Sequence, residues 1–472
     1  MKKFTKILLI GCLLVVSCNN WLDVDPKSQV KDKDLFASEM GFKEALSGVY
    51  SLMTKEGLYG KELTFGWLGV LGQEWTSVPY NYEDDQKYDF ENAASEVRID
   101  SVWTGLYNAI ANANKLLKEL EGKENLFSGD NYSIIKGEVL ALRAYLHFDL
   151  LRIFGASCAV GMERIAIPYV TEYAPTIFPQ EKVGDFVGKV LKDLQDAAKC
   201  LENDPILTGR TVSEIDDNGY LMNRQVHLNY YAVKGLMARV YLYKGDYANA
   251  EVCAKEVIGS GCFEWVKQEN LTNESVADLT FSTEHLFALN IVTLGNIVDK
   301  YLDGGNNSFA LEESRLSEYY GSSYDYRYLY LFKTGVGMSN TLRYLKKYDQ
   351  LESVSWAQSY RNKLPLICLP EMYYILAECR YHSSGDVLEP LNEVCRHRGV
   401  ADLSEADLSA FETLLLAEYR KEVIGGGQLF FQYKRLNRSV VPGTDVDLAG
   451  EGRYVIPMPK EELENPGWVS NQ

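Results

Sequence analysis

The feature that most restricts the fold is a stretch that is apolar on two sides of one helix. The sequence KGEVLALRAYLHFDLLRIFG, residues 136–155, has helical periodicity and carries two apolar stripes. One stripe consists of Val139, Leu142, Leu146, Leu150 and Ile153, and the other of Leu140, Ala144, Phe148 and Leu151. Such a helix must bury one stripe against the preceding helix and the other against the next. The stretch therefore predicts an inner helix of an antiparallel helical stack.

Two further stretches resemble tetratricopeptide repeats, in which two short helices cross closely. In residues 233–258, small and large side chains occupy the positions where the helices would meet, namely Ala238, Tyr241, Ala250, Ala254 and Val257. Gly245 and Asp246 stand at the expected turn of this unit. A looser unit covers residues 371–400, with its turn at Gly385 and Asp386. We also expect helices over residues 38–54, 99–120, 184–202 and 408–424.

Between the two repeat-like units, residues 262–365 are richer in Gly and Tyr and lose the helical periodicity. This pattern predicts loops and short strands laid over the helical scaffold. We therefore predict a mainly α fold, a tetratricopeptide-like helical repeat scaffold with an irregular loop-rich ligand-binding section. The scaffold would occupy about residues 38–260 and 366–435, and the C-terminal segment 436–472 would complete one domain over residues 18–472.

The N-terminus, MKKFTKILLIGCLLVVSC, has the layout of a secretory signal. Lysines at positions 2, 3 and 6 precede an apolar run over residues 7–16, which is shorter than the ~20 residues that a membrane-spanning helix needs. Val15-Val16-Ser17-Cys18 resembles the lipobox of bacterial lipoproteins, in which the cysteine is acylated. We therefore predict a signal peptide over residues 1–17 and lipidation of Cys18, which would hold the chain on a membrane. The alternative is an ordinary signal peptide with an incidental cysteine.

Charge and cysteine content narrow the class of protein. Removal of residues 1–17 takes away three lysines and no acidic residue, so the formal net charge moves from −18 to −21. A surface this acidic repels phosphate backbones, so we expect no nucleic-acid partner. Seven of the nine cysteines lie beyond Cys18, so at least one of them is unpaired. Several of the seven, such as Cys253 and Cys379, lie in apolar helical patterns, which favours buried thiols over a disulfide framework.

No catalytic motif is present in the sequence. The five histidines are never four apart, so H-E-x-x-H is absent, and G-x-S-x-G, the phosphate-binding G-x-x-x-x-G-K-[ST] and C-x-x-C are absent as well. Glu83, Asp84 and Asp85 lack the spacing of a calcium loop, and we expect them to form a solvated face. We therefore expect no enzyme activity, no metal and no cofactor. A hydrolase remains an open alternative, because a pair of glycosidase carboxylates leaves no motif in the sequence.

Two aromatic-rich stretches contain the candidate ligand contacts. Both lie in weakly periodic sequence, where we expect side chains to reach the surface. Tyr and Trp combine a flat apolar face with a polar edge, which suits stacking on sugar rings or gripping an extended peptide. The candidates are Trp75, Tyr80, Tyr82 and Tyr88 in residues 74–90, and Tyr319, Tyr320 and Tyr324 in residues 319–330. The alternative is that these rings cover the small cores of their own loops.

The order of several motifs resembles the SusD/RagB family over nearly the whole chain after the signal. These motifs are the lipobox, WLDVDP at 21–26, the two-stripe helix, the two repeat-like units, the segment 418–435 and the closing YVIPMPKEELENPGW at 454–468. The resemblance implies a lipid-anchored outer-membrane protein that faces the cell exterior. It would bind a nutrient, usually an oligosaccharide and in some members a peptide, and deliver it to a SusC-like TonB-dependent transporter.

The resemblance also implies where a ligand would bind. In the family, the binding face includes the loop before the W-x-x-x-Y-x-x-I-x-x-A-N helix, which here begins its motif at Trp103, together with the irregular section between the repeat units. The candidate aromatic residues lie in those two regions. A scaffold whose grooves bind a protein partner, and no nutrient, is a further alternative.

One segment departs from the family pattern. Residues 418–435 keep Glu418, Arg420, Glu422, Gly427, Lys434 and Arg435, but have Gly426, Leu429 and Gln432 where the family has an acid, an arginine and an aspartate. Loss of one partner alone would leave an uncompensated buried charge that costs about 3–5 kcal/mol. We therefore interpret the joint loss as a dismantled ion network, a structural divergence that weakens the transfer of ligand type.

Overall fold

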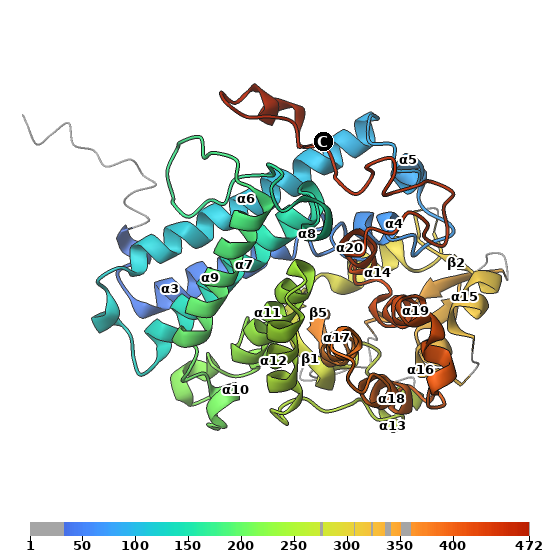
Figure 1. Ribbon diagram of the computed structural model, residues 1–472. Helices are drawn as coiled ribbons and strands as arrows, with labels where there is room; N and C mark the ends of the chain where they lie inside the picture. Colours follow the sequence, from blue (N-terminus) through green and yellow to red (C-terminus); the bar gives the residue numbers. More distant parts are fainter. Residues whose placement is uncertain are drawn as a thin grey trace, which may run out of the picture.

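The main feature of the computed structural model is a continuous row of helices, each packed on the next (Figure 1). The structure describes residues 33–273, 277–305, 307–321, 324–335, 341–350 and 360–471. The row consists of α3 (Glu39–Met53), α6 (Ala93–Leu120), α7 (Asn131–Phe154), α9 (Val183–Cys200), α11 (Tyr230–Lys244), α12 (Tyr247–Ile258), α17 (Leu369–His382) and α18 (Leu388–His397). The predicted mainly α fold, built on a helical stack, is confirmed.

Helix α7 is the inner helix that the two apolar stripes predict. Both stripes are buried, because α6 and α9 both pack against this helix. Gly137 permits the close approach of α9, since a Cβ atom at this position would lie 2.7 Å from the Cγ of Leu201. A charged residue of α7 is also paired inside the stack, where Arg143 donates to Asp193 of α9 at 2.7 Å. Helix α7 therefore forms the centre of the scaffold.

The two repeat-like units form the helix pairs α11–α12 and α17–α18. Helix α11 ends at Gly245, whose φ of +80° is left-handed, and the side chain of Asp246 accepts a hydrogen bond from the Asn249 N–H at 3.2 Å to start α12. Asp386 does the same for α18, accepting from the Leu388 N–H at 3.1 Å. Helix α12 packs on α17, so the irregular section leaves the row at one unit and returns to it at the other.

The irregular section contains two small antiparallel sheets. Strand β1 (His285–Asn290) pairs with β5 (Lys363–Cys368), and β4 (Leu342–Leu345) lies between β2 (Leu311–Glu312) and β3 (Phe332–Thr334). The prediction of loops and strands is incomplete, because the section also holds the short helices α13 (Glu269–Thr272), α14 (Leu294–Tyr301), α15 (Glu313–Tyr320) and α16 (Tyr326–Tyr330). Helices this short complete too few turns for a 3.6-residue period to show in the sequence.

The remaining short helices join these parts, and the C-terminal segment returns to α6. They are α4 (Trp67–Leu71), α5 (Glu83–Gln86), α8 (Cys158–Gly161), α10 (Pro205–Thr208), α19 (Phe411–Val423) and α20 (Leu429–Arg435). Within the described ranges, no helix has both the length and the apolar character that a bilayer span requires. The predicted signal and Cys18 lie outside the described residues.

The seven cysteines beyond Cys18 are all free. Burial raises the pKa of the Cys253 thiol to about 11 and that of Cys379 to about 12, so both are protonated thiols at neutral pH. This agrees with the prediction of buried thiols over a disulfide framework.

Candidate functional site

The two aromatic-rich stretches of the sequence lie side by side in the structure. Ser77 and Ala310 exchange backbone hydrogen bonds of 3.0 Å in both directions, and the Glu312 N–H donates to Thr76 Oγ1 at 2.7 Å. We call the described part of this surface, residues 76–84, 310–321 and 324–330, the loop face. The fold thus joins two segments that the sequence could propose only separately.

Four of the seven candidate aromatics are buried beneath this surface, so their expected exposure is wrong. Trp75, Tyr82, Tyr88 and Tyr320 have exposed fractions of 2%, 2%, 0% and 4%. Each polar edge finds an acceptor inside the protein: Phe65 O for Trp75 Nε1, Glu62 for the Tyr82 hydroxyl, Leu71 O for that of Tyr88 and Lys421 O for that of Tyr320. An aromatic ring with a satisfied polar edge gains more from burial than from exposure. These four rings therefore belong to the main hydrophobic core of the protein.

The other three candidates reach the surface to different degrees. Tyr80 is 86% exposed and Tyr324 is 76% exposed, whereas Tyr319 is half-buried, with the Arg420 guanidinium 4.2 Å from its ring centre. The turn that carries Tyr80 is held by Arg98, which donates to the Asn81 carbonyl at 3.1 Å. Tyr80, Tyr319 and Tyr324 remain predicted ligand contacts.

The acidic run that follows Tyr82 divides into a solvated part and a structural part. Glu83 and Asp84 are exposed, as expected. Asp85 is fully buried, where it pairs with Arg98 and accepts from Trp67 Nε1 at 3.0 Å. Burial raises the pKa of its carboxyl to about 6. Asp85 therefore fixes the base of the loop face and leaves no three-carboxylate cluster for calcium.

A buried ion network anchors the second aromatic stretch. Its members are Glu284, Asp325, Arg327, Arg398, Glu418 and Glu422. Arg327 of α16 lies 2.9 Å from Glu422 of α19, which also pairs with Arg398 at 2.7 Å. Burial alone would raise the pKa of Glu422, but the guanidinium groups of Arg398 and Arg327 lower it to about 2. The carboxylate therefore stays ionised and holds α16 against α19.

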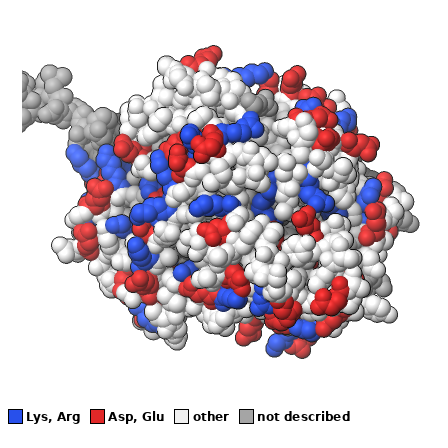
Figure 2. Space-filling view, viewed as in Figure 1, with Lys and Arg blue, Asp and Glu red and all other residues white. Residues whose placement is uncertain are grey.

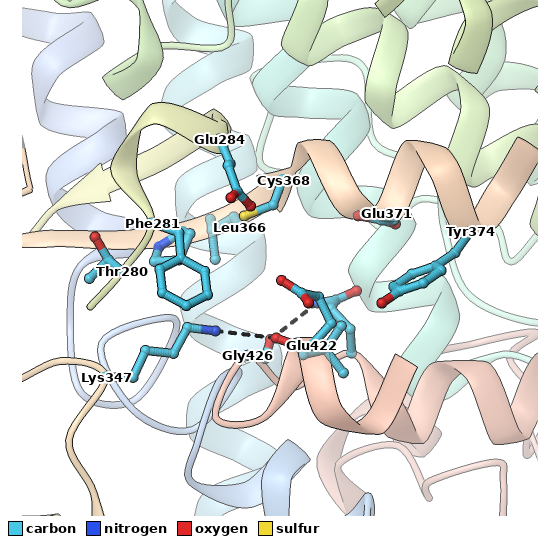
Figure 3. A pocket seen from close by; sticks show the side chains of 13 residues that line it. Thr280, Phe281, Glu284, Lys347, Leu366, Cys368, Glu371, Tyr374, Glu422 and Gly426 are labelled. Carbon is cyan, nitrogen blue, oxygen red and sulfur yellow. Dashed lines mark hydrogen bonds between the residues drawn. The ribbon is translucent and has the colours of Figure 1, made fainter. Parts of the chain in front are cut away.

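The cavity beside this network is too small for a ligand. It is lined by Glu284, Lys347 and Glu422 among others, and its volume is about 50 Å³ (Figure 3). Pockets that hold small molecules measure roughly 300–1,000 Å³, whereas a space of this size takes only a few water molecules. The network is therefore structural support for the loop face.

A second surface, which the sequence did not predict as a unit, has the geometry of a binding site. It is a cleft of about 410 Å³, where α6, the loop 168–178 and the C-terminal segment meet. We call it the aromatic cleft, and its principal residues are Trp103, Tyr107, Asn108, Phe178, Asn465 and Trp468. The rings of Trp103 and Tyr107 lie 4.9 Å apart, and those of Trp103 and Trp468 lie 6.5 Å apart at 67°.

The polar edges of these rings are bound within the protein, which fixes the rings in place. Trp103 Nε1 donates to Glu462 Oε1 at 3.0 Å, Trp468 Nε1 donates to the Phe178 carbonyl at 3.1 Å, and the Tyr107 hydroxyl donates to the Pro168 carbonyl at 2.9 Å. Tyr107 and Trp468 are only half-buried, and Asn108, the next residue of α6, is exposed and lines the same cleft. The cleft thus offers preorganised aromatic surface beside amide groups.

The sequence contains one local signal for this cleft. Trp103 and Tyr107 are four residues apart on one helix, and residues at this spacing lie on the same face. Glu462 and Trp468, which complete the cleft, come from the far end of the chain. Their contact with α6 depends on the fold, so no spacing in the sequence could have indicated it.

Across the described ranges, His, Cys, Asp and Glu side chains nowhere gather in a group of three that could hold an ion. Glu74 is the buried carboxyl with the strongest perturbation near the loop face, because burial raises its pKa to about 8. It bonds to a backbone N–H of the protein and lines none of the clefts described above.

Comparisons with known families and curated proteins converge on one group. A SusD-like family described as "Starch-binding associating with outer membrane" matches residues 20–242. A SusD-like protein of Formosa agariphila is 24% identical over 269 residues, which cover 56% of this chain and 47% of that protein. A second SusD-like protein of the same organism is 25% identical over 31% of this chain and 29% of its own length. The chain thus spans about half, or less, of the curated relatives it matches.

Solved structures show the same fold over almost the whole chain. A SusD superfamily protein of Bacteroides thetaiotaomicron superposes with a TM-score of 0.74 at 21% identity, covering 92% of this chain and all (100%) of that one. A protein described as a laminarin-binding SusD-like protein superposes with a TM-score of 0.64 at 18% identity, covering 91% of this chain and 100% of that one.

Proposed function

We propose that this chain, which is similar to SusD-like proteins, binds a nutrient glycan and delivers it to a SusC-like TonB-dependent transporter. Lipidation of Cys18 would hold it on the outer membrane, facing the cell exterior. The protein would act by binding alone, without catalysis. Support for the membrane comes from the matching family, whose description places it with the outer membrane.

The aromatic cleft is the observation that carries this proposal. Its rings offer flat apolar faces, and Thr104, Asn108 and Asn465 add neutral hydroxyl and amide groups that can bond to sugar hydroxyls. Among the described residues that line it, Glu462 is the only charged side chain, and its two carboxylate oxygens accept from Trp103 and Asn465. A neutral, polyhydroxylated ring fits this lining better than a charged ligand does.

A glycan is favoured over a peptide by what the similar proteins bind. The matching family is described as starch-binding, and one structural neighbour is described as laminarin-binding. An extended peptide would also pack on aromatic rings, and it would use its backbone N–H and C=O groups for the same amides. Peptide capture is therefore the second candidate function.

Affinity electrophoresis of the full chain in detergent, through gels that contain single polysaccharides, tests the proposal. The panel should include starch and laminarin, and a mixed-peptide library should be run beside it. We expect retardation by one neutral glycan. Retardation by none of the glycans, together with binding of peptides, would replace the glycan by a peptide.

Alanine variants then distinguish the two candidate surfaces. Removal of one stacking ring costs about 0.5–1.5 kcal/mol, so Tyr107→Ala and Trp468→Ala should each weaken binding about two- to tenfold if the aromatic cleft holds the glycan. Tyr80→Ala combined with Tyr324→Ala would have the larger effect if the loop face holds it. Tyr381, which is 45% exposed on α17, provides an aromatic control away from both surfaces.

A further inference from the structure

A second cavity, lined in part by residues of α8 and α20, has the charge that the aromatic cleft lacks. Its volume is about 420 Å³, and it lies where α8, α20 and the C-terminal segment meet (Figure 1). We call it the basic pocket, and we define it by Ser157, Arg164, Lys434, Asn437, Arg453 and Tyr454. Among the described residues that line it, Glu451 is the only carboxylate, and it lies 3.1 Å from Arg453. The pocket therefore carries an excess of positive charge.

This excess stands out because the protein as a whole is acidic. The formal net charge of the chain is −18. Acidic and basic side chains alternate over the face seen in Figure 2, with no broad region of one sign. A concave site lined by cations concentrates its field on whatever enters it, even when the surrounding surface is acidic. The pocket is thus a place where an anion would be favoured over a neutral molecule.

Lys434 carries a buried amino group without an ionic partner in the described part of the chain. Its side chain is 1% exposed, and its one hydrogen bond goes to the Ile153 carbonyl, at 3.2 Å, in the last turn of α7. Burial lowers the pKa of its ammonium group well below the ordinary value, and the Arg152 and Arg164 guanidinium groups lower it further. An ammonium can donate three hydrogen bonds. Lys434 therefore keeps donors for which the described residues supply no acceptor.

Two more donors at the pocket lack acceptors among the described residues. The hydroxyl of Ser157 is buried, in a residue that is 3% exposed, and has no hydrogen-bond partner. The guanidinium of Arg164 is exposed and forms no ion pair with any described carboxylate. A buried polar group without a partner costs about 1–3 kcal/mol. All three residues line the pocket, so an oxyanion bound in it would supply acceptors on their side of the cavity.

We propose that the basic pocket binds an anionic sugar, with a carboxylate or sulfate group placed between Ser157, Arg164 and Lys434. The oxyanion chemistry follows from the donors, and a volume of about 420 Å³ admits a sugar ring behind the charged group. That the anion is carried by a sugar rests on the proposed glycan-binding function. A polysaccharide that contains both neutral and acidic residues would then bind at two places, a neutral ring in the aromatic cleft and an acidic ring in the basic pocket, and two linked contacts bind a polymer more tightly than either alone.

Isothermal titration of the full chain in detergent with small probes tests this proposal. The probes are glucuronate, glucose 6-sulfate, free sulfate and neutral glucose. We expect the two charged sugars to bind, binding to weaken as NaCl is raised, and neutral glucose to show no binding at the same concentrations. If free sulfate binds and neither charged sugar does, the pocket is only an oxyanion site, and the proposal of an anionic sugar is refuted. Equal binding of glucose and glucuronate would refute the anionic recognition.

Variants of the pocket make the test specific. Arg164→Ala and Ser157→Ala should each weaken glucuronate binding, the arginine variant at least about tenfold, because hydrogen bonds to charged groups are the stronger kind. Arg396→Ala, at an exposed arginine paired with Glu393, is the matched control and should change nothing. Unchanged binding in folded Arg164→Ala protein would show that Lys434 only caps α7 and that the pocket holds water.

The outcome is separable from that of the proposed function. Tyr107→Ala removes a ring of the aromatic cleft and should leave glucuronate binding to the pocket unchanged. Absence of neutral-glycan retardation in the parent protein, with glucuronate binding intact, would count against the aromatic cleft alone. Absence of glucuronate binding with neutral-glycan retardation intact would count against the basic pocket alone.

Discussion

The carboxyl group of Glu74 is buried at the base of the loop face without an ion pair among the described residues. Its Oε2 accepts a hydrogen bond from the Gly425 N–H at 2.7 Å, whereas Oε1 has no partner. Burial raises its pKa from 4.5 to about 8, against a smaller opposing effect of the Gly425 hydrogen bond and of Lys347 and Arg420. The folded protein therefore holds this proton at neutral pH, whereas the unfolded chain releases it.

The expected effect on stability follows from proton linkage. Between pH 4.5 and pH 8 the folded state binds one proton more than the unfolded state, so stability from this group falls as pH rises. Each pH unit in that window costs about 1.4 kcal/mol, so Glu74 lowers the free energy of unfolding by about 3 kcal/mol at pH 7 relative to pH 4.5. Below pH 4.5 both states are protonated and the effect vanishes.

In Glu74→Gln the side chain keeps the shape of the neutral carboxyl group but has no titratable proton. We expect this variant to be more stable than the parent by about 3 kcal/mol at pH 7, and by little at pH 5. Urea unfolding of both proteins at pH 5, 6, 7 and 8 measures the difference. Other carboxyls, such as Glu422, affect the pH dependence of the free energy of unfolding equally in both proteins. Only the difference between the two proteins therefore reports on Glu74. Glu83→Gln, at an exposed glutamate of the loop face, is the matched control.

A pH-independent difference would contradict this explanation, because a lost hydrogen bond or altered packing does not depend on a proton. A Glu74→Gln variant that is less stable than the parent at pH 7 would contradict it more strongly. That result would mean that Glu74 is ionised in the folded protein, with Lys347 or Arg420 as its effective partner.

Four further predictions concern the fold and the anchor. Arg327→Met leaves Asp325 without its buried counter-charge, and it should lower the free energy of unfolding by about 3–5 kcal/mol in urea, whereas Arg315→Met at the surface of α15 should change it little. Gly245→Ala forces a Cβ atom into left-handed backbone and should cost about 1–2 kcal/mol by the same assay. Gly188→Ala, in the middle of α9 with open space around it, should instead stabilise by about 0.5–1 kcal/mol. Cys18→Ala should move the protein from the membrane fraction to the soluble fraction on immunoblots, and continued membrane attachment would exclude the lipid anchor.

The helical scaffold could be predicted because its signals are local. The two stripes of α7 and the Gly245-Asp246 turn each lie within one helix or one turn, and α3 and α9 begin and end within two residues of the predicted ranges. Helix α6 is longer than predicted, since it begins at Ala93 after an Asn92 cap. The polar residues of its first turns hide the apolar period from which a helix is usually inferred.

The candidate site could be predicted only in part, because burial depends on distant partners. Tyr80 and Tyr82 lie in the same irregular stretch, and nothing in the sequence distinguishes their exposure. Tyr82 is buried because its hydroxyl donates to the distant Glu62 at 2.8 Å. The aromatic cleft needs a contact between Trp103 and Glu462, and the basic pocket needs Lys434 and Ser157 to line the same cavity. Each of these contacts is made by the fold, and no motif records it.

The divergent segment 418–435 shows how this chain has adjusted to the loss of charges. Glu418 and Glu422 remain in a network with Arg327, so the ion network is not dismantled as a whole. Gln432 accepts from Arg435 at 3.1 Å, as a carboxylate would, without bringing a charge.

No such replacement compensates for the lost charge near Glu74. It reaches this segment through the Gly425 N–H, and Leu429, at the position of the family's arginine, is a fully buried apolar residue. Glu74 could form an ion pair, and so avoid its raised pKa, only if a cation occupied position 429. If Leu429→Arg lowered the pKa of Glu74, the pH dependence of stability would flatten without any change at Glu74 itself, and the cost of burying the new guanidinium would be offset by the pair. A Leu429→Arg protein that keeps the parental pH dependence would show that the two positions do not face each other.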